Sequence, residues 1–156
     1  MPPIVGEDAK VLILGSMPGK VALQTQRYYN NKGNRFWSLL FGYFNTPITN
    51  DYEVRKDLVT KNGIALWDVL ECCERGDTSA DKDIMDGEPI NLEDFLKEKK
   101  IKAILLKGGK AHEEFQKHFK QFSSLAIPLP STSGGNGWWG RMNGAKAWTD
   151  SLDKLL

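Results

Sequence analysis

The sequence has little of the cysteine and histidine that most metal centres need. Its 2 cysteines, Cys72 and Cys73, are adjacent, and its 2 histidines are His112 and His118. Neighbouring cysteines seldom bridge each other, and without a CxxC pair they cannot build an iron–sulfur or zinc site unless other residue types contribute. The spacing of the histidines places them on different faces of a helix. The sequence therefore predicts surface histidines and no metal.

An excess of one charge and long hydrophobic runs are also missing. The 21 basic residues balance the 20 acidic ones, giving a net charge of +1. A balanced total favours neither nucleic acid nor membrane, although it can hide a basic face. No apolar run approaches the roughly 20 residues of a membrane span, and the first ten residues lack the pattern of a signal peptide. We expect a cytoplasmic protein that does not enter a membrane.

The pattern of short apolar runs and amphipathic segments predicts an α/β fold. The length of 156 residues suits a single domain over residues 1–156. Helices and strands alternate, which is typical of helices packed around a parallel sheet. A polar, turn-rich surface loop is expected at 74–89. The predicted strands are 10–16, 64–70, 101–109 and the start of 124–137, and the predicted helices are 34–44, 51–63, 91–100, 110–122 and 143–156.

Two of the predicted strands end in unusual loops, and ligands of parallel sheets bind at such ends. The first loop is "GSMPG", in which Gly15, Pro18 and Gly19 shape a rigid turn. It matches neither GxxxxGK[ST] nor GxGxxG, so the sequence gives no support for binding of nucleoside triphosphates or dinucleotides through these motifs. The second is "PLPSTSGGNG", whose hydroxyls and glycines suit phosphate contact. A plain surface loop of serine and glycine is the alternative.

The segment "YYNNKGNRFW" combines rings and amides close to the first loop. Tyr28 and Tyr29 suit either a core or a lid over a pocket. Asn34 suits a helix N-cap, whereas Phe36 and Trp37 begin the apolar stripe of a helix. An aromatic face beside an amide is also how proteins hold a flipped-out base. Both interpretations stay open on spacing alone.

Taken together, "LILGSMPG", "YYNNKGNRFW", "GIALWDVLECCERG", "IKAILLKGGKA" and "LPSTS" resemble the uracil-DNA glycosylase superfamily. The resemblance is strongest to its hypoxanthine-DNA (deoxyinosine) glycosylase branch, which is related to the mismatch-specific uracil/thymine-DNA glycosylases. It implies a three-layer α/β/α sandwich with a four-stranded parallel sheet. It also implies hydrolysis of the N-glycosidic bond of a flipped-out deaminated base, hypoxanthine or uracil, without a cofactor. The implied partner is DNA with deaminated or mismatched bases, bound by a monomer.

The same resemblance implies roles for individual residues. Many relatives have an asparagine or aspartate that activates water where Met17 stands, and Asn34 takes that role in the hypoxanthine branch. Tyr29 is the ring that stacks on the base. The implied base pocket consists of Gly15, Ser16, Met17, Pro18, Tyr29 and Phe36. The implied loop that contacts the DNA backbone and carries the wedge consists of Ser131, Thr132, Ser133 and Gly134.

The chain departs from the branch in two places. The pair at 31–32 is Asn-Lys instead of His-Pro, and the pair at 134–135 is Gly-Gly instead of Pro-Ala. The wedge that fills the gap left by the flipped base is therefore small. Trp138 or Trp139 suits this role, and a core position is the alternative for both.

The expected mechanism passes through a cationic sugar, as in glycoside hydrolysis. Asn34 orients the water through its amide oxygen, and the effect is mainly positional. Backbone N–H groups of 15–19 stabilise the departing base. Asp68 is a second candidate to activate water, and a cap or ion pair is its alternative role. The sequence shows no lysine suited to Schiff-base chemistry, so we expect a monofunctional enzyme.

Two other classes of function remain open on the sequence alone. Met17 and the small wedge also suit a protein that binds damaged or single-stranded DNA without cleaving it. The near-neutral charge leaves room for a hydrolase of free nucleosides or nucleotides.

Overall fold

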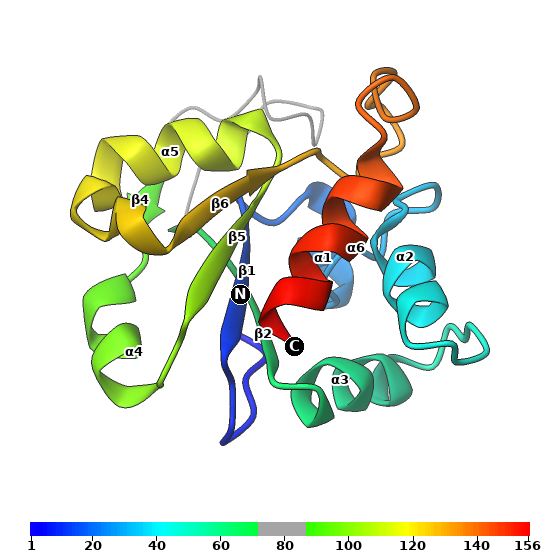
Figure 1. The fold of residues 1–156 in the computed structure, drawn as a ribbon, viewed down its shortest axis with the longest axis horizontal. Coiled ribbons are helices and arrows are strands. Elements are labelled where there is room, and N and C mark those ends of the chain that lie inside the picture. The colour runs from blue at the N-terminus through cyan, green and yellow to red at the C-terminus, as the bar shows by residue number, and fades with distance from the viewer. Residues whose placement is uncertain (72–86) are drawn as a thin grey trace.

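Four parallel strands form the centre of the molecule in the computed structural model, which describes residues 1–71 and 87–156 (Figure 1). Their order across the sheet is β2-β1-β5-β6. The predicted parallel sheet is therefore confirmed. The four strands are β1 (Val11–Gly15), β2 (Ile64–Asp68), β5 (Ala103–Lys107) and β6 (Ala126–Leu129). The short strands β3 (Leu70–Glu71) and β4 (Glu88–Pro89) pair antiparallel beside the sheet.

Helices cover both faces of the sheet, which confirms the three-layer α/β/α sandwich. Helices α4 and α5 lie on one side, and α2, α3 and α6 lie on the other (Figure 1). The short helix α1 was not predicted, and the last predicted turns of α5 tighten into a 3₁₀ helix at Lys120–Leu125. The predicted loop at 74–89 lies mostly outside the described residues. The helices are α1 (Lys20–Thr25), α2 (Phe36–Tyr43), α3 (Tyr52–Lys61), α4 (Leu92–Glu98), α5 (Gly109–Phe119) and α6 (Gly144–Leu155).

Side-chain caps start two of the helices where the sequence predicted them. The Asp51 carboxylate accepts hydrogen bonds from the N–H groups of Glu53 and Val54 at the start of α3. The Asn91 side chain accepts one from the N–H of Asp94 at the start of α4. Each bond satisfies a backbone donor that has no partner within its helix.

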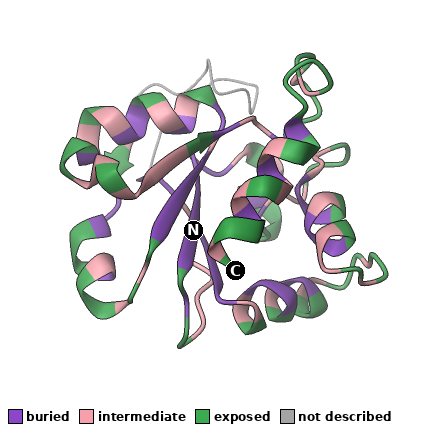
Figure 2. Cartoon of the chain, in the orientation of Figure 1, coloured by how far each residue is buried: buried purple, intermediate pink, exposed green. Residues whose placement is uncertain are grey.

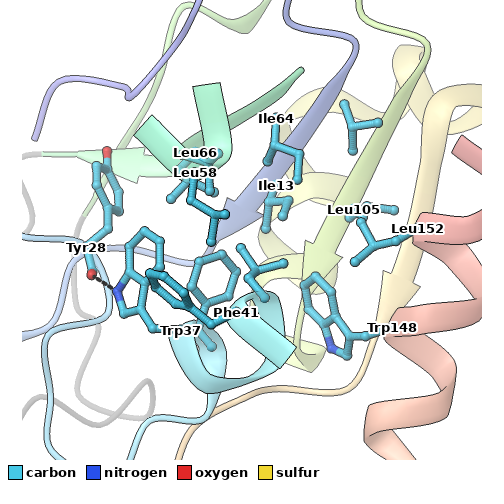
Figure 3. Packing of buried hydrophobic residues seen from close by; sticks show 14 of the residues in the cluster. Ile13, Tyr28, Trp37, Phe41, Leu58, Ile64, Leu66, Leu105, Trp148 and Leu152 are labelled. Carbon is cyan, nitrogen blue, oxygen red and sulfur yellow. Dashed lines mark hydrogen bonds between the residues drawn. The ribbon is translucent and has the colours of Figure 1, made fainter. Parts of the chain in front are cut away.

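The core is divided by the sheet into two layers, because neighbouring strand residues point to opposite faces. Ile13 faces the larger layer, where Trp37, Phe41 and Trp148 are buried (Figure 3). The Trp37 indole N–H donates to the carbonyl of Tyr28 over 2.9 Å, which ties the segment before α2 to this layer. Leu12 and its neighbours face the second layer, under α4 and α5. Strands β1, β2 and β5 are buried along nearly their whole length, whereas the edge strand β6 is buried only at Leu129 (Figure 2).

The connections of the central strand create a crevice at the carboxyl edge of the sheet. Strand β1 lies between β2 and β5, and the chain passes from β1 to β2 on one side before it reaches β5 on the other. The loops that follow β1 and β5 therefore leave in different directions, which opens the position where such sheets bind ligands. In the described part of the chain, no helix is long and apolar enough to span a membrane.

Candidate active site

A cavity of about 430 Å³ lies at this carboxyl edge. Its walls come from the loop after β1, the turn before α2, the ends of β2 and β5, and the loop after β6. Of the predicted site residues, Gly15, Ser16, Met17, Tyr29, Asn34, Ser131 and Ser133 line it. Four others, Pro18, Phe36, Thr132 and Gly134, are outside its lining. The loops that the resemblance selected thus meet around one cavity.

The two adjacent tyrosines have different places. Tyr28 is 2% exposed, and its hydroxyl donates to the carbonyl of Pro2 over 2.9 Å. Burial raises the pKa of Tyr28, so its hydroxyl stays neutral. Tyr29 lines the cavity with a φ of 52°, a left-handed conformation that is rare for a large side chain and common at functional sites. Phe36 is fully buried, and its ring centroid is 4.3 Å from that of Tyr29, so Phe36 supports Tyr29 from behind.

Asn34 is held by two hydrogen bonds to its side-chain oxygen. The N–H of Phe36 donates to Oδ1 over 2.9 Å, and the hydroxyl of the fully buried Thr132 also donates over 2.9 Å. The first bond gives a partner to the N–H of Phe36, the first residue of α2. The N-cap position itself is Arg35, so the prediction that Asn34 is the N-cap is wrong by one residue. Because both partners are donors, the atom that they share is the oxygen, and the plane of the amide is fixed. The amide nitrogen forms no hydrogen bond with another described residue.

The turn before α2 and the loop after β6 interlock around Asn34. The N–H of Arg35 donates to the carbonyl of Thr132 over 2.8 Å, and Arg35 Nη1 donates to the carbonyl of Ser133 over 2.7 Å. A side-chain carbon on Gly134 would lie 2.9 Å from the carbonyl oxygen of Gly33, so this position accepts only glycine without a shift of backbone. We call residues 33–36 and 131–134 the inner rim.

Two charged residues at strand ends also line the cavity. Asp68 ends β2, pairs in register with Gly15 and is 3% exposed. A side-chain carbon on Gly15 would collide with Asp68 Oδ1 and lie 3.1 Å from the Tyr29 hydroxyl. Lys107 ends β5, and its Nζ lies 4.6 Å from the centroid of the Tyr29 ring. Since β2 and β5 flank β1 at about 4.8 Å per step, the two backbone positions are roughly 10 Å apart.

Sequence reasoning missed Lys107, although a signal was present. The run "AILLK" is apolar until its last residue, and a lysine that ends a buried parallel strand faces the carboxyl edge, where ligands bind. Asn136 also lines the cavity, and its Nδ2 donates to the carbonyl of Ser131 over 2.9 Å. No spacing in the sequence pointed to Asn136.

The described residues hold no group of three or more histidine, cysteine, aspartate or glutamate side chains that could bind a metal ion. Both histidines are half-buried on α5, and His118 Nε2 lies 3.4 Å from a carboxylate oxygen of Glu114. Cys72 and Cys73 lie outside the described residues. The cavity instead combines an aromatic ring, an amide, a carboxylate and an ammonium, which suits a flat heterocycle with several hydrogen-bonding groups.

Known proteins resemble this chain in sequence and in fold. The model of the family described as the uracil DNA glycosylase superfamily matches residues 2–154. A hypoxanthine DNA glycosylase of Methanosarcina barkeri is 33% identical over 138 residues, which is 86% of this chain and 85% of the relative. A second hypoxanthine DNA glycosylase, from Methanosarcina acetivorans, is 35% identical over the same shares. A protein of Methanosarcina acetivorans solved by solution NMR as a candidate uracil DNA glycosylase superimposes with a TM-score of 0.83 at 29% identity, covering 99% of this chain and 96% of the other.

Proposed function

The chain belongs to the uracil DNA glycosylase superfamily and is a DNA repair glycosylase for deaminated bases, and we propose that hypoxanthine is its base and Asn34 its central catalytic residue. The observation that carries the proposal is the single cavity that brings Tyr29, Asn34, Asp68 and Lys107 together. A flipped base would enter this cavity and stack on Tyr29. The fold also supports one domain over residues 1–156, and we expect a monomer.

Lys107 supports the choice of a 6-oxopurine. Hypoxanthine presents O6 and N7 as neighbouring acceptors, the same pair that lysine reads on guanine in the major groove. Adenine presents an amino donor in place of O6, so an ammonium would face another donor there. Lys107 Nζ lies over the ring of Tyr29 in the free protein, so a base that stacks on this ring would displace the ammonium toward the edge of the base. We therefore assign Lys107 to the O6/N7 edge of the bound base.

The same contact would help the base to leave. When the bond between the base nitrogen and sugar C1′ breaks, its electron pair goes to the base, and negative charge spreads over the purine ring. A fixed ammonium at O6 and N7 stabilises that charge more than the charge of the intact nucleotide, which is the condition for catalysis. Backbone N–H groups of residues 15–19 remain further candidate donors.

Asn34 would position the attacking water. Its Oδ1 already accepts two hydrogen bonds, so we assign the contact with water to Nδ2 rather than to the oxygen that the sequence suggested. A donor bond from Nδ2 leaves the second lone pair of the water for the cationic C1′. The new bond joins the water oxygen to C1′, and the water loses a proton. Asp68 is the carboxylate in the cavity that would accept this proton.

Lys107 lies in the cavity, where a lysine could in principle form a Schiff base with the sugar. Its surroundings nevertheless support a glycosylase without lyase activity. A Schiff base requires a neutral amine, whereas a contact with the face of Tyr29 is one that an ammonium makes. We expect no covalent adduct when the enzyme acts on hypoxanthine DNA in the presence of borohydride. A trapped adduct that disappears in Lys107→Met would make the enzyme bifunctional.

The deciding experiment is a base-release assay with labelled duplexes that carry hypoxanthine, uracil, xanthine or a mismatched thymine. Wild type should release hypoxanthine fastest, and Asn34→Ala should lose about 100-fold or more in rate while it still binds the duplex. Wild-type turnover in Asn34→Ala would remove Asn34 from the mechanism. DNA binding without release of any base would favour a non-catalytic binder, and efficient hydrolysis of deoxyinosine itself would favour a nucleosidase.

A further inference from the structure

The loop between the inner rim and α6 carries an exposed tryptophan beside an arginine. This outer loop, residues 136–142, projects from the body of the molecule (Figure 1), and most of it is exposed (Figure 2). The side chain of Trp138 is 60% exposed, and Arg141 Cζ lies 4.9 Å from the centroid of its ring. Tryptophan and arginine are the residues that binding surfaces are enriched in, so an exposed pair of the two is typical of a contact site.

The outer loop is a defined turn fixed to the rim of the cavity. The Asn136 side chain accepts the N–H of Trp138 over 3.1 Å, and the carbonyl of Trp138 accepts the N–H of Met142 over 2.8 Å. Asn136 itself is bonded to Ser131 and lines the cavity. Trp138 is therefore held in a turn anchored at the cavity edge.

The neighbouring tryptophan has a different role. Trp139 packs against Gly144 at the start of α6, where a side-chain carbon would collide with its ring. The guanidinium of Arg35 lies 5.5 Å from the centroid of the Trp139 ring. Trp139 thus joins the outer loop to the inner rim and leaves Trp138 to point outward.

Residues 131–134, the part of the inner rim that follows β6, have no side chain large enough to fill the gap left by a flipped nucleotide. Gly134 is pressed against the backbone of Gly33 and has no room for a side chain. The Ser133 hydroxyl accepts the N–H of Gly135 over 3.3 Å and is committed to the turn. In the described part of this loop, Trp138 is the exposed side chain with the area of a base.

We propose that Trp138 enters the base stack of double-stranded DNA at the place that the flipped nucleotide leaves, with Arg141 binding a neighbouring phosphate. The proposal rests on the proposed glycosylase function, since it requires a flipped base in the cavity beside the loop. Aromatic side chains stack on bases of any sequence, and apolar wedges hold a duplex open. The guanidinium adds a charged contact to the phosphate backbone.

The test compares base release from hypoxanthine in a duplex and in the same oligonucleotide as a single strand, in single turnover. Trp138→Ala should slow release from the duplex roughly tenfold or more, because the lost stacking no longer holds the stack open. Release from the single strand should stay within about twofold, because there is no stack to fill. Trp138→Phe keeps a ring and should retain most of the duplex rate. Val54→Ala, an exposed apolar position on α3, is the control and should match wild type on both substrates.

Equal rates for Trp138→Ala and wild type on the duplex would overturn the proposal, as would an equal loss on both substrates. If wild type releases no base, the proposed glycosylase function is wrong. The role of Trp138 is then tested separately by measuring DNA binding. The probe is a duplex with an abasic-site analogue opposite 2-aminopurine. Trp138→Ala should bind it about tenfold more weakly and lose the fluorescence change on binding. Arg141→Ala should lower the slope of log affinity against log salt by about 1, and unchanged affinity and slope in both variants would contradict the proposal.

Discussion

The outer loop follows the second segment of the inner rim in the sequence, but the polar and aromatic groups of the two regions have opposite arrangements. In the inner rim, Asn34, Arg35 and Thr132 bond to one another, so each fixes the position of the next. In the outer loop, Trp138 and Arg141 contact each other and face solvent. Cleavage of a glycosidic bond requires groups that are fixed to within a fraction of an ångström. Contact with a DNA duplex requires side chains that are exposed on the surface. We therefore propose that the inner rim positions the reacting groups and that the outer loop contacts DNA.

The largest effect that separates the two regions is expected at Thr132. Thr132→Val keeps the shape of the side chain and removes the hydroxyl that fixes Asn34 Oδ1. We expect kcat to fall by about 100-fold with little change in KM for hypoxanthine DNA, because a displaced group near the reaction costs about that much. Thr132→Ser keeps the hydroxyl and should restore most of the rate. An equal loss in Thr132→Ser would mean that packing, rather than the hydrogen bond, is the contribution of Thr132.

The next largest effect is expected at Lys107 and concerns the preference for one base over another. Substitutions in the outer loop should not change this preference. Lys107→Met removes the ammonium and keeps a long apolar stem beside Tyr29. We expect kcat/KM for hypoxanthine to fall by roughly 10- to 100-fold relative to wild type, because one good contact to a base edge discriminates by about 1–3 kcal/mol. The preference for hypoxanthine over adenine should narrow, as measured by release from matched duplexes. Retained preference would place base recognition in the backbone of the loop after β1.

A matched pair of glycines compares the two regions in stability. Gly134→Ala places a carbon 2.9 Å from the carbonyl oxygen of Gly33, whereas Gly137→Ala in the outer loop meets nothing within 4 Å. We expect Gly134→Ala to lower the free energy of unfolding by about 1–3 kcal/mol and Gly137→Ala to change it little. Urea unfolding of both variants measures the difference. Equal free energies of unfolding in the two variants would mean that the backbone at Gly33 and Gly134 shifts to accommodate the added carbon without loss of stability.

The sequence predicted the elements better than the contacts of the site. The runs that became β1 and β5 are apolar and end in glycine or lysine, so their place in a parallel sheet could be predicted. Helix α1 was missed because it has six residues and no side-chain cap. The bond between Asn34 and Thr132 joins residues 98 positions apart, and no local pattern encodes such a contact. The contact between Lys107 and Tyr29 could not be predicted for the same reason, because these residues are also far apart in the sequence.

The smallest effect is expected at the cap of α3, which belongs to neither region and provides a baseline for both. Asp51→Ala removes the carboxylate that accepts the N–H groups of Glu53 and Val54. The free energy of unfolding should fall by about 1 kcal/mol, since those donors lose their acceptor. Asp51→Asn keeps a capping oxygen and should recover most of this loss. Base release by the folded enzyme should be unchanged in both variants, because the cap is part of neither the cavity nor the outer loop. A loss of activity without a loss of stability would extend the functional surface to α3, and the division between inner rim and outer loop would then be incomplete.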